Sequence, residues 1–177
     1  RKIYDKEGKF IRGSGYAQDV TSQIEYENAL IKAKSIQHLT TMPIIADDSG
    51  FEVEALNNEP GLYSARYAAK YGGYKEAMEH IINELKDKDN KRAKFICDIV
   101  LLNVEDKPLL FEGIVEGVVA NQLEGEGGFG YDPCFISNET GKTYANMSEG
   151  DKNKTSHRGK ALKKLLTYLR ITGKITI

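Results

Sequence analysis

The stretch IIADDSGFEVEAL, residues 44–56, joins a short apolar run, two adjacent carboxylates and a segment in which apolar and acidic residues alternate. The run Ile44–Ala46 is typical of a buried strand, and the alternation over 51–56 is typical of a half-buried one. The sequence therefore predicts two strands, with Asp47 and Asp48 at the end of the first.

The acidic pair has two interpretations. Asp, Ser and Gly all favour turns, so the pair fits a solvated turn. Neighbouring carboxylates also repel and raise each other's pKa unless a cation or hydrogen-bond donors offset their charge, so the pair equally fits a divalent-metal site. Ligands of α/β proteins collect at the carboxyl ends of strands, which favours the second interpretation.

Composition fits an ordinary globular protein. The 177 residues include 40% hydrophobic and 29% charged residues, and the net charge is −1. This length suits one domain, and the charge gives no general attraction to nucleic acid or to a membrane. No apolar run is long enough to cross a bilayer and no secretory leader is recognisable, so we expect a cytoplasmic protein. Cys97 and Cys134 are expected to be reduced packing residues.

The remaining periodicities alternate between helix and strand. Segment 1–20 predicts a hairpin or a loose lead-in, and Ser22 with Glu25 has the spacing of a helix start that leads to about Leu39. Segment 57–73 is loop-like around Pro60 and Gly61. Further elements are predicted as a helix over 74–85, paired strands over 92–102 and 110–120, and a helix from Ser156 to about Gly173. Interleaved strands and helices indicate an α/β fold with a mixed sheet.

The glycines Gly113 and Gly117 interrupt the second strand of that pair. A glycine inside a strand indicates either a bulge or a close approach of another backbone. Both explanations stay open at this point.

A second unusual stretch is EGEGGFGYDPCF, residues 124–135. Its glycines let the backbone approach a flat ligand closely, with Phe129 or Tyr131 as a stacking surface and Asp132 as an acceptor. A tight loop between strands explains the same glycines.

A third stretch is EGDKNKTSHRGKAL, residues 149–162. Lys152, His157 and Arg158 converge on a predicted helix N-terminus, where free N–H groups and the helix dipole favour anions. The alternative is a solvated lysine face. Zinc spacings, a G-x-S-x-G elbow and a G-x-x-x-x-G-K-[ST] loop do not occur, so covalent catalysis by Ser or Cys has little support.

Together these stretches resemble the inosine triphosphate pyrophosphatase family. The resemblance rests, in order, on ENALIKAK, on ADDSGFEVEAL with PGLYSARYA, on GGFGYDPCF and on KNKTSHRGKAL. It implies an elongated α/β fold whose mixed central sheet floors a cleft between two lobes, and a homodimer. It also implies Mg²⁺-dependent hydrolysis of non-canonical purine nucleoside triphosphates (ITP, dITP and XTP) to monophosphate and pyrophosphate.

The resemblance also assigns site residues. It implies that Asp48 is the catalytic proton acceptor and a metal ligand, and that Asp19 is a second, weaker match to a metal ligand. The substrate contacts that it implies are Ser49, Phe129, Gly130, Tyr131, Asp132, Lys152, His157 and Arg158. We expect Asp48 and Phe129 to face each other across one groove.

One part of the family pattern has no match. Members begin with a strand and a Thr/Ser-x-Asn-x-x-Lys loop that holds the phosphates, and the residues before Asp19 contain neither. We therefore expect residues 1–177 to form a single domain that lacks this strand and loop. Either they precede the present sequence or the protein has lost them. A protein that has lost them could be a non-catalytic purine nucleotide binder, and a phosphatase that releases orthophosphate is a further rival.

Overall fold

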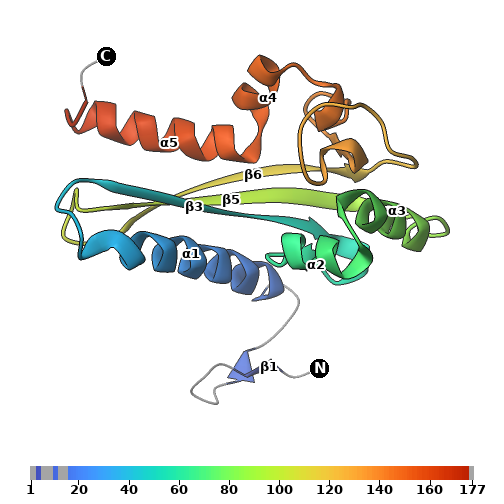
Figure 1. Cartoon of the computed structure of the whole chain (residues 1–177), viewed down its shortest axis with the longest axis horizontal. Coiled ribbons are helices and arrows are strands. Elements are labelled where there is room, and N and C mark those ends of the chain that lie inside the picture. The colour runs from blue at the N-terminus through green and yellow to red at the C-terminus, as the bar shows by residue number, and fades with distance from the viewer. Residues whose placement is uncertain (1–2, 5–9, 12–15, 176–177) are drawn as a thin grey trace.

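The computed structural model of the chain describes the backbone of residues 3–4, 10–11 and 16–175, and the side chains of residues 26–175. Its centre is a five-stranded sheet in the order β4-β3-β5-β6-β7 (Figure 1). The strands are β3 (Ile44–Val53), β4 (Glu59–Gly61), β5 (Arg92–Leu102), β6 (Leu109–Val119) and β7 (Phe135–Ser137). A separate two-stranded sheet pairs β1 (Ile3–Tyr4) with β2 (Phe10–Ile11). The interleaving of strands and helices confirms the α/β class. Every strand pair described is antiparallel, so the parallel pairing that a mixed sheet requires is not seen among the described strands.

The described residues include five α-helices, which pack around the sheet. They are α1 (Tyr16–Gln37), α2 (Ser64–Tyr71), α3 (Tyr74–Glu84), α4 (Glu149–Thr155) and α5 (His157–Ile171). Figure 1 shows α1 along one side of the long strands and α5 along the other. The described part of the chain also contains three short 3-10 helices: η1 (Glu54–Leu56), η2 (Asp132–Cys134) and η3 (Tyr144–Asn146). No helix among the described residues combines the length and the apolar character that a bilayer crossing requires.

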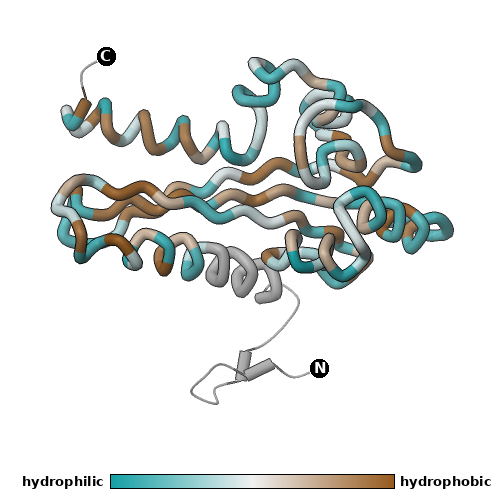
Figure 2. The backbone as a smooth tube through the Cα atoms, in the orientation of Figure 1, coloured by the Kyte–Doolittle hydropathy of each residue, from teal (hydrophilic) through white to brown (hydrophobic). Residues whose placement is uncertain are grey.

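Each face of the sheet has its own buried cluster. On one face Ala29 and Ala33 of α1 pack against Val100 and Leu102 of β5. On the other face Ala161 and Leu165 of α5 belong to a cluster with Cys97, Ile99, Leu101 and Phe111. A further cluster joins buried residues of α2 and α3 to the strand aromatics Phe51, Phe95 and Phe135. The central strands are accordingly hydrophobic over much of their length in Figure 2. The sheet thus separates an α1 face from an α5 face.

Gly113 fixes how closely α5 approaches the sheet. A Cβ atom at this position would lie 2.0 Å from the backbone oxygen of His157 and 2.6 Å from the backbone nitrogen of Ala161. The pairing of β5 with β6 runs through Gly113 without an extra residue. Of the two explanations for the strand glycines, Gly113 therefore marks a close backbone approach, and it lets the first turn of α5 rest on β6.

Most long elements predicted from periodicity are confirmed. The helix over 74–85, the paired strands around the turn before residue 109, and the final helix with Ser156 as its N-cap are all present. Ser156 Oγ accepts a hydrogen bond from the Gly159 backbone N–H at 3.1 Å. Both cysteines are buried free thiols, as predicted, and burial raises the pKa of Cys97 to about 11.

Three local predictions are wrong. The first helix begins at Tyr16 and not at Ser22, because Ser-x-x-Glu spacing also occurs inside helices and no breaker precedes it. Segment 54–56 is a 3-10 turn and not a strand, because Asn57 and Asn58 adopt left-handed conformations with φ of 56° and 64° and reverse the chain into β4. Segment 57–73 is not a loop, since it contains β4 and α2.

Candidate active site

The acidic pair lies inside a strand and not at the end of one. β3 continues without a break from Ile44 to Val53, and every residue of it pairs with β5. Successive side chains of a strand point to opposite faces of a sheet. Asp47 therefore faces α5 and Asp48 faces α1, which corrects the prediction of a strand end and of a common direction for the two carboxylates.

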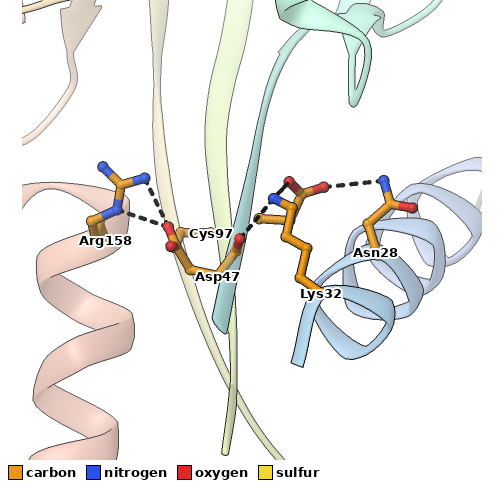
Figure 3. A network of polar contacts seen from close by, with 6 residues as sticks. Asn28, Lys32, Asp47, Cys97 and Arg158 are labelled. Carbon is orange, nitrogen blue, oxygen red and sulfur yellow. Dashed lines mark hydrogen bonds and ion pairs between the residues drawn. The ribbon is translucent and has the colours of Figure 1, made fainter. Parts of the chain in front are cut away.

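On the α1 face, Asp48 is held by two side chains of α1, Asn28 and Lys32, which are labelled in Figure 3. Lys32 Nζ lies 2.5 Å from Asp48 Oδ1 and donates a second bond to the Asp47 backbone oxygen at 2.9 Å. Asn28 Nδ2 donates to Asp48 Oδ2 at 3.2 Å. The Asp48 side chain is 16% exposed, so both of its oxygens are oriented in a partly buried position.

On the α5 face, Asp47 pairs with the first turn of α5. Arg158 donates from Nε and Nη2 to the same oxygen, Asp47 Oδ2, at 2.9 and 2.7 Å. The Asp47 side chain is 40% exposed. Each member of the acidic pair thus has its own cation, and both cations come from helices on opposite sides of β3 (Figure 3).

A hollow of about 620 Å³ lies beside the first turn of α5. Its lining includes Phe129, Lys152, His157 and Arg158, four of the predicted substrate contacts. The Phe129 side chain is 66% exposed, which is unusual for a large aromatic group and leaves its ring accessible.

Lys152 connects this ring to the loop. Its ammonium lies 4.5 Å from the centre of the Phe129 ring and forms an ion pair with the buried carboxylate of Asp132. Asp132 also accepts from the Phe129 backbone N–H at 2.7 Å. This folded-back carboxylate requires glycine at position 128, where a Cβ atom would lie 2.1 Å from Asp132 Oδ2. The glycine-rich loop therefore places an aromatic face and a hydrogen-bond donor side by side.

His157 forms part of the floor of the hollow. Its ring stacks on Phe95 with 4.7 Å between centres, and Nδ1 has no hydrogen-bond partner among the described residues. Burial, followed by the charges of Arg158 and Lys152, lowers the pKa of His157 to about 3. His157 is therefore a neutral imidazole at physiological pH and offers a polar atom without a charge.

A third carboxylate accompanies Asp48 on the α1 face. Asp98 of β5 lies directly opposite Asp48, and Glu112 of β6 lies directly opposite Asp98. Asp98 is 0% exposed, and neither of its carboxylate oxygens has a hydrogen-bond partner within the described part of the chain. Burial, then the charges of Glu112 and Asp48, raises the pKa of Asp98 to about 7.

The structure does not bring every predicted site residue into the hollow. Tyr131 is buried, stacks on Phe51 at 5.0 Å and donates from its hydroxyl to the Ser64 backbone oxygen, so it supports the loop from below. Gly130, with φ of 60°, shapes the same loop. Ser49 follows Asp48 on the α5 face, where its buried hydroxyl lies opposite the Cys97 thiol of β5.

The expected groove between Asp48 and Phe129 is not found as predicted. Asp48 lies on the α1 face and does not line the hollow that contains Phe129. The reason is the continuous strand, which places Asp48 and the hollow on opposite sides of the sheet. Asp19 lies in α1, and its side chain is outside the residues whose side chains are described.

Sequence reasoning assigned no role to Asn28, Lys32 and Asp98, and it considered Asp47 only as a member of the acidic pair. Asn28 and Lys32 are four residues apart in ENALIKAK, a spacing that puts both on one helix face, and this signal could have identified them. Asp98 interrupts the apolar strand 92–102, where a lone acidic residue is a comparable signal.

The donors on the α1 face fit a divalent cation. Among the residues with described side chains, no three His, Cys, Asp or Glu cluster into a complete protein cage. Mg²⁺ commonly uses one or two carboxylates and completes its shell with water and phosphate oxygens. Asp48, together with the unpaired oxygens of Asp98, meets this smaller requirement.

An exposed aromatic ring beside a lysine and a helix N-terminus, with carboxylates on the neighbouring strand, is typical of α/β proteins that bind nucleotides. The Ham1 family model matches residues 15–168, and the chain belongs to the Ham1 family. This confirms the resemblance found in the sequence.

Named relatives are consistent with that membership. A dITP/XTP pyrophosphatase of Staphylococcus epidermidis is 43% identical over 143 residues, which cover 81% of this chain and 73% of the relative. One of Pectobacterium atrosepticum is 44% identical over 148 residues, with 81% and 75% covered. The Ham1 protein structure of Staphylococcus aureus superposes with a TM-score of 0.75 at 40% identity, covering 81% of this chain and 75% of that one.

Proposed function

We propose that this chain is a nucleoside triphosphate pyrophosphatase that hydrolyses ITP, dITP and XTP to the monophosphate and pyrophosphate. The observation that carries the proposal is the Phe129–Lys152–Asp132 arrangement beside the first turn of α5, in a chain 43% identical to a dITP/XTP pyrophosphatase. Such hydrolysis removes unsuitable purines from the nucleotide pool.

The hollow is the proposed base site. The exposed ring of Phe129 offers a stacking surface for a purine, and stacking of this kind contributes about 1–3 kcal/mol per base. Lys152 lies over that ring, 4.5 Å from its centre, and is held there by Asp132, so its N–H groups are directed before a nucleotide arrives.

Selectivity follows from hydrogen-bond polarity. Hypoxanthine and xanthine carry an oxygen at position 6 that accepts a hydrogen bond, whereas adenine carries an amino group that donates. Donors from Lys152 or Arg158 therefore favour the first two bases. A buried donor without a partner costs about 1–3 kcal/mol, which is enough to discriminate against ATP by tenfold or more.

The edge of β3 is the proposed phosphate site. Among the described strands, residues 44–50 pair with β5 only, so the other edge of β3 has no partner strand there. A triphosphate that leaves the hollow past Arg158 and crosses this edge reaches Lys32 and Asp48. This path explains how residues on the two faces of the sheet contact one substrate.

Asp48 is the proposed proton acceptor. Water attacks the α-phosphorus, the bond from that phosphorus to the bridging oxygen breaks, and pyrophosphate leaves while a carboxylate oxygen of Asp48 takes the proton from water. Lys32 and Asn28 orient this carboxylate, and the Lys32 ammonium favours the negative charge of the phosphates.

We further propose that Mg²⁺ is held by Asp48, with Asp19 as a second ligand. A bound divalent ion neutralises charge on phosphoryl oxygens and lowers the pKa of a coordinated water. A homodimer acting in the cytoplasm is part of the same proposal, supported by the family resemblance of the sequence.

One assay tests the reaction against its rivals. The protein is incubated with ITP and Mg²⁺, and the products are identified. Pyrophosphate with IMP is expected. Orthophosphate would indicate a phosphatase, and unchanged ITP that nevertheless binds would indicate a non-catalytic nucleotide binder. Equal hydrolysis of ATP and ITP would contradict the proposed basis of selectivity.

A further inference from the structure

Asp98 is the most unusual side chain on the α1 face. It lies in the middle strand of the row Asp48–Asp98–Glu112, and its exposed fraction is 0%. Directly opposite residues of an antiparallel pair have Cβ atoms about 4.5–5.5 Å apart and point to the same face. Its carboxylate is therefore a near neighbour of the Asp48 carboxylate.

No described group compensates Asp98. Neither of its oxygens accepts a hydrogen bond from the described residues, and the Lys32 ammonium on this face is bonded to Asp48 and to the Asp47 backbone oxygen. A buried polar group without a partner destabilises a fold, and an uncompensated carboxylate does so more strongly. A purely structural role would be met better by an apolar side chain, since the part of β5 over residues 95–102 is otherwise apolar.

The neighbourhood is built to attract a cation. Asp48 Oδ1 and the Asp47 backbone oxygen already converge on one positive group, the ammonium of Lys32. The Asp98 oxygens add two hard donors, without hydrogen bonds from the described residues, on the same face of the sheet. Two carboxylates completed by water and phosphate oxygens are a common protein contribution to a Mg²⁺ or Mn²⁺ site.

We propose that Asp98 is a further carboxylate of the divalent-cation site, acting beside Asp48 from a buried position on the neighbouring strand β5. This inference rests on the proposed function, since the cation is the one that accompanies the triphosphate. Asp98 raises the affinity of the site for the cation, at the expense of the stability of the cation-free protein.

The test is a titration of the whole chain with Mn²⁺ in the absence of nucleotide. The concentration of free Mn²⁺ is measured by electron paramagnetic resonance, and the difference from the total gives the bound Mn²⁺. Asp98→Asn keeps the size of the side chain and removes its charge. We expect its Mn²⁺ affinity to be about tenfold or more below that of the parent, as for loss of a carboxylate close to a metal. The rise in Tm that Mn²⁺ gives the parent should shrink in parallel, while the Tm without Mn²⁺ should stay level or increase.

Glu112→Gln is the matched control, because it removes one negative charge from the other neighbour of Asp98 in the same row. Its Mn²⁺ affinity should stay within about twofold of the parent, since Glu112 lies one strand further from Asp48 than Asp98 does and the effect of a more distant charge is screened. Asp98→Val provides a second variant with an apolar side chain that suits a buried strand, and it should lose affinity as Asp98→Asn does.

Three results would overturn the inference: parent-like Mn²⁺ affinity in both Asp98 variants, an equal loss in Glu112→Gln, or no Mn²⁺ binding by the parent at millimolar concentration. Failure of the proposed function has a different signature. In that case the parent releases no pyrophosphate from dITP, whatever the Asp98 variants do to Mn²⁺ binding.

Discussion

Asp47 and Asp48 are adjacent in the chain but belong to different surfaces of the molecule. Asp47 is 40% exposed and pairs with Arg158 of α5, beside the hollow that contains Phe129. Asp48 is 16% exposed and is held by Lys32 and Asn28 of α1, beside buried Asp98. The continuous strand β3 separates the two like charges across the sheet, so each is matched with a cation of its own.

This contrast shows how one strand can supply two parts of a site. The α5 face offers an aromatic ring and donors, which suit a base, and the α1 face offers carboxylates, which suit a metal and a proton transfer. Ion pairs that are exposed contribute little, whereas a partly buried carboxylate with fixed partners is oriented for chemistry. The two faces should therefore respond differently to substitution.

The largest expected effect is at Asp48. Asp48→Asn removes the proposed proton acceptor and a metal ligand, and kcat for pyrophosphate release from dITP should fall by about 10³-fold or more. Nucleotide binding, measured by calorimetry, should persist in part because the hollow is unchanged. The matched variant Asp47→Asn, which removes the exposed carboxylate, should keep kcat within about tenfold of the parent. Equal losses in the two variants would erase the distinction between the faces.

A substitution of Lys152 tests the proposed base site in the hollow beside α5. Lys152→Met removes a donor from the hollow and leaves the Asp132 carboxylate buried without its cation, so the free energy of unfolding should fall by about 3–5 kcal/mol. The ratio of kcat/KM for dITP to that for dATP should fall by about tenfold in the same variant.

The double variant Asp132→Asn/Lys152→Met separates these two effects. It removes both charges, so much of the lost stability, measured by urea unfolding, should return while the selectivity stays low. A double variant with parental selectivity would show that Lys152 acts only through the stability of the loop.

Gly113 tests how the α5 face is positioned. Gly113→Ala places a Cβ atom 2.0 Å from the His157 backbone oxygen, so the first turn of α5 must move, at an expected loss of about 1–3 kcal/mol in unfolding free energy. KM for dITP should rise while Mn²⁺ affinity, which depends on the α1 face, should change little. Gly150→Ala, in α4 with no atom within 4 Å of the added Cβ, is the control and should leave both properties near parental values.

The sequence predicted some strands and helices better than others. Periodicity was sufficient for β5, β6, α3 and α5, because their apolar positions repeat at the spacing that the core requires. It was not sufficient for β3, because acidic residues and a glycine in its middle have the local character of a turn. Only the pairing of the whole strand with β5, which connects residues about 50 positions apart, makes that segment extended.

The candidate site was predictable as a set of residues and not as an arrangement. Motif resemblance identified Phe129, Lys152, His157 and Arg158, which the structure does bring to one hollow. It could not show that Asp48 points away from that hollow, since the face of a strand residue depends on register. Asp98 was missed for a related reason: its significance comes from its cross-strand neighbour and not from its own segment.

His157 gives the smallest expected effect and a test by pH. Burial, with the charges of Arg158 and Lys152, lowers the pKa of His157 to about 3 from its ordinary value of 6.5. Between pH 6.5 and 3, His157 is therefore protonated in the unfolded chain and neutral in the folded protein. The unfolding free energy falls as the pH falls through this range, by at most about 1.4 kcal/mol per pH unit. Above pH 6.5 this contribution disappears.

His157→Phe keeps an aromatic ring against Phe95 and cannot be protonated. From pH 6 to pH 5 the parent should lose about 1 kcal/mol more unfolding free energy than the variant, as measured by urea denaturation. Equal losses of unfolding free energy in the parent and the variant would mean that His157 is protonated in the folded protein. The α5 face would then present one more positive charge to the nucleotide than a neutral imidazole does.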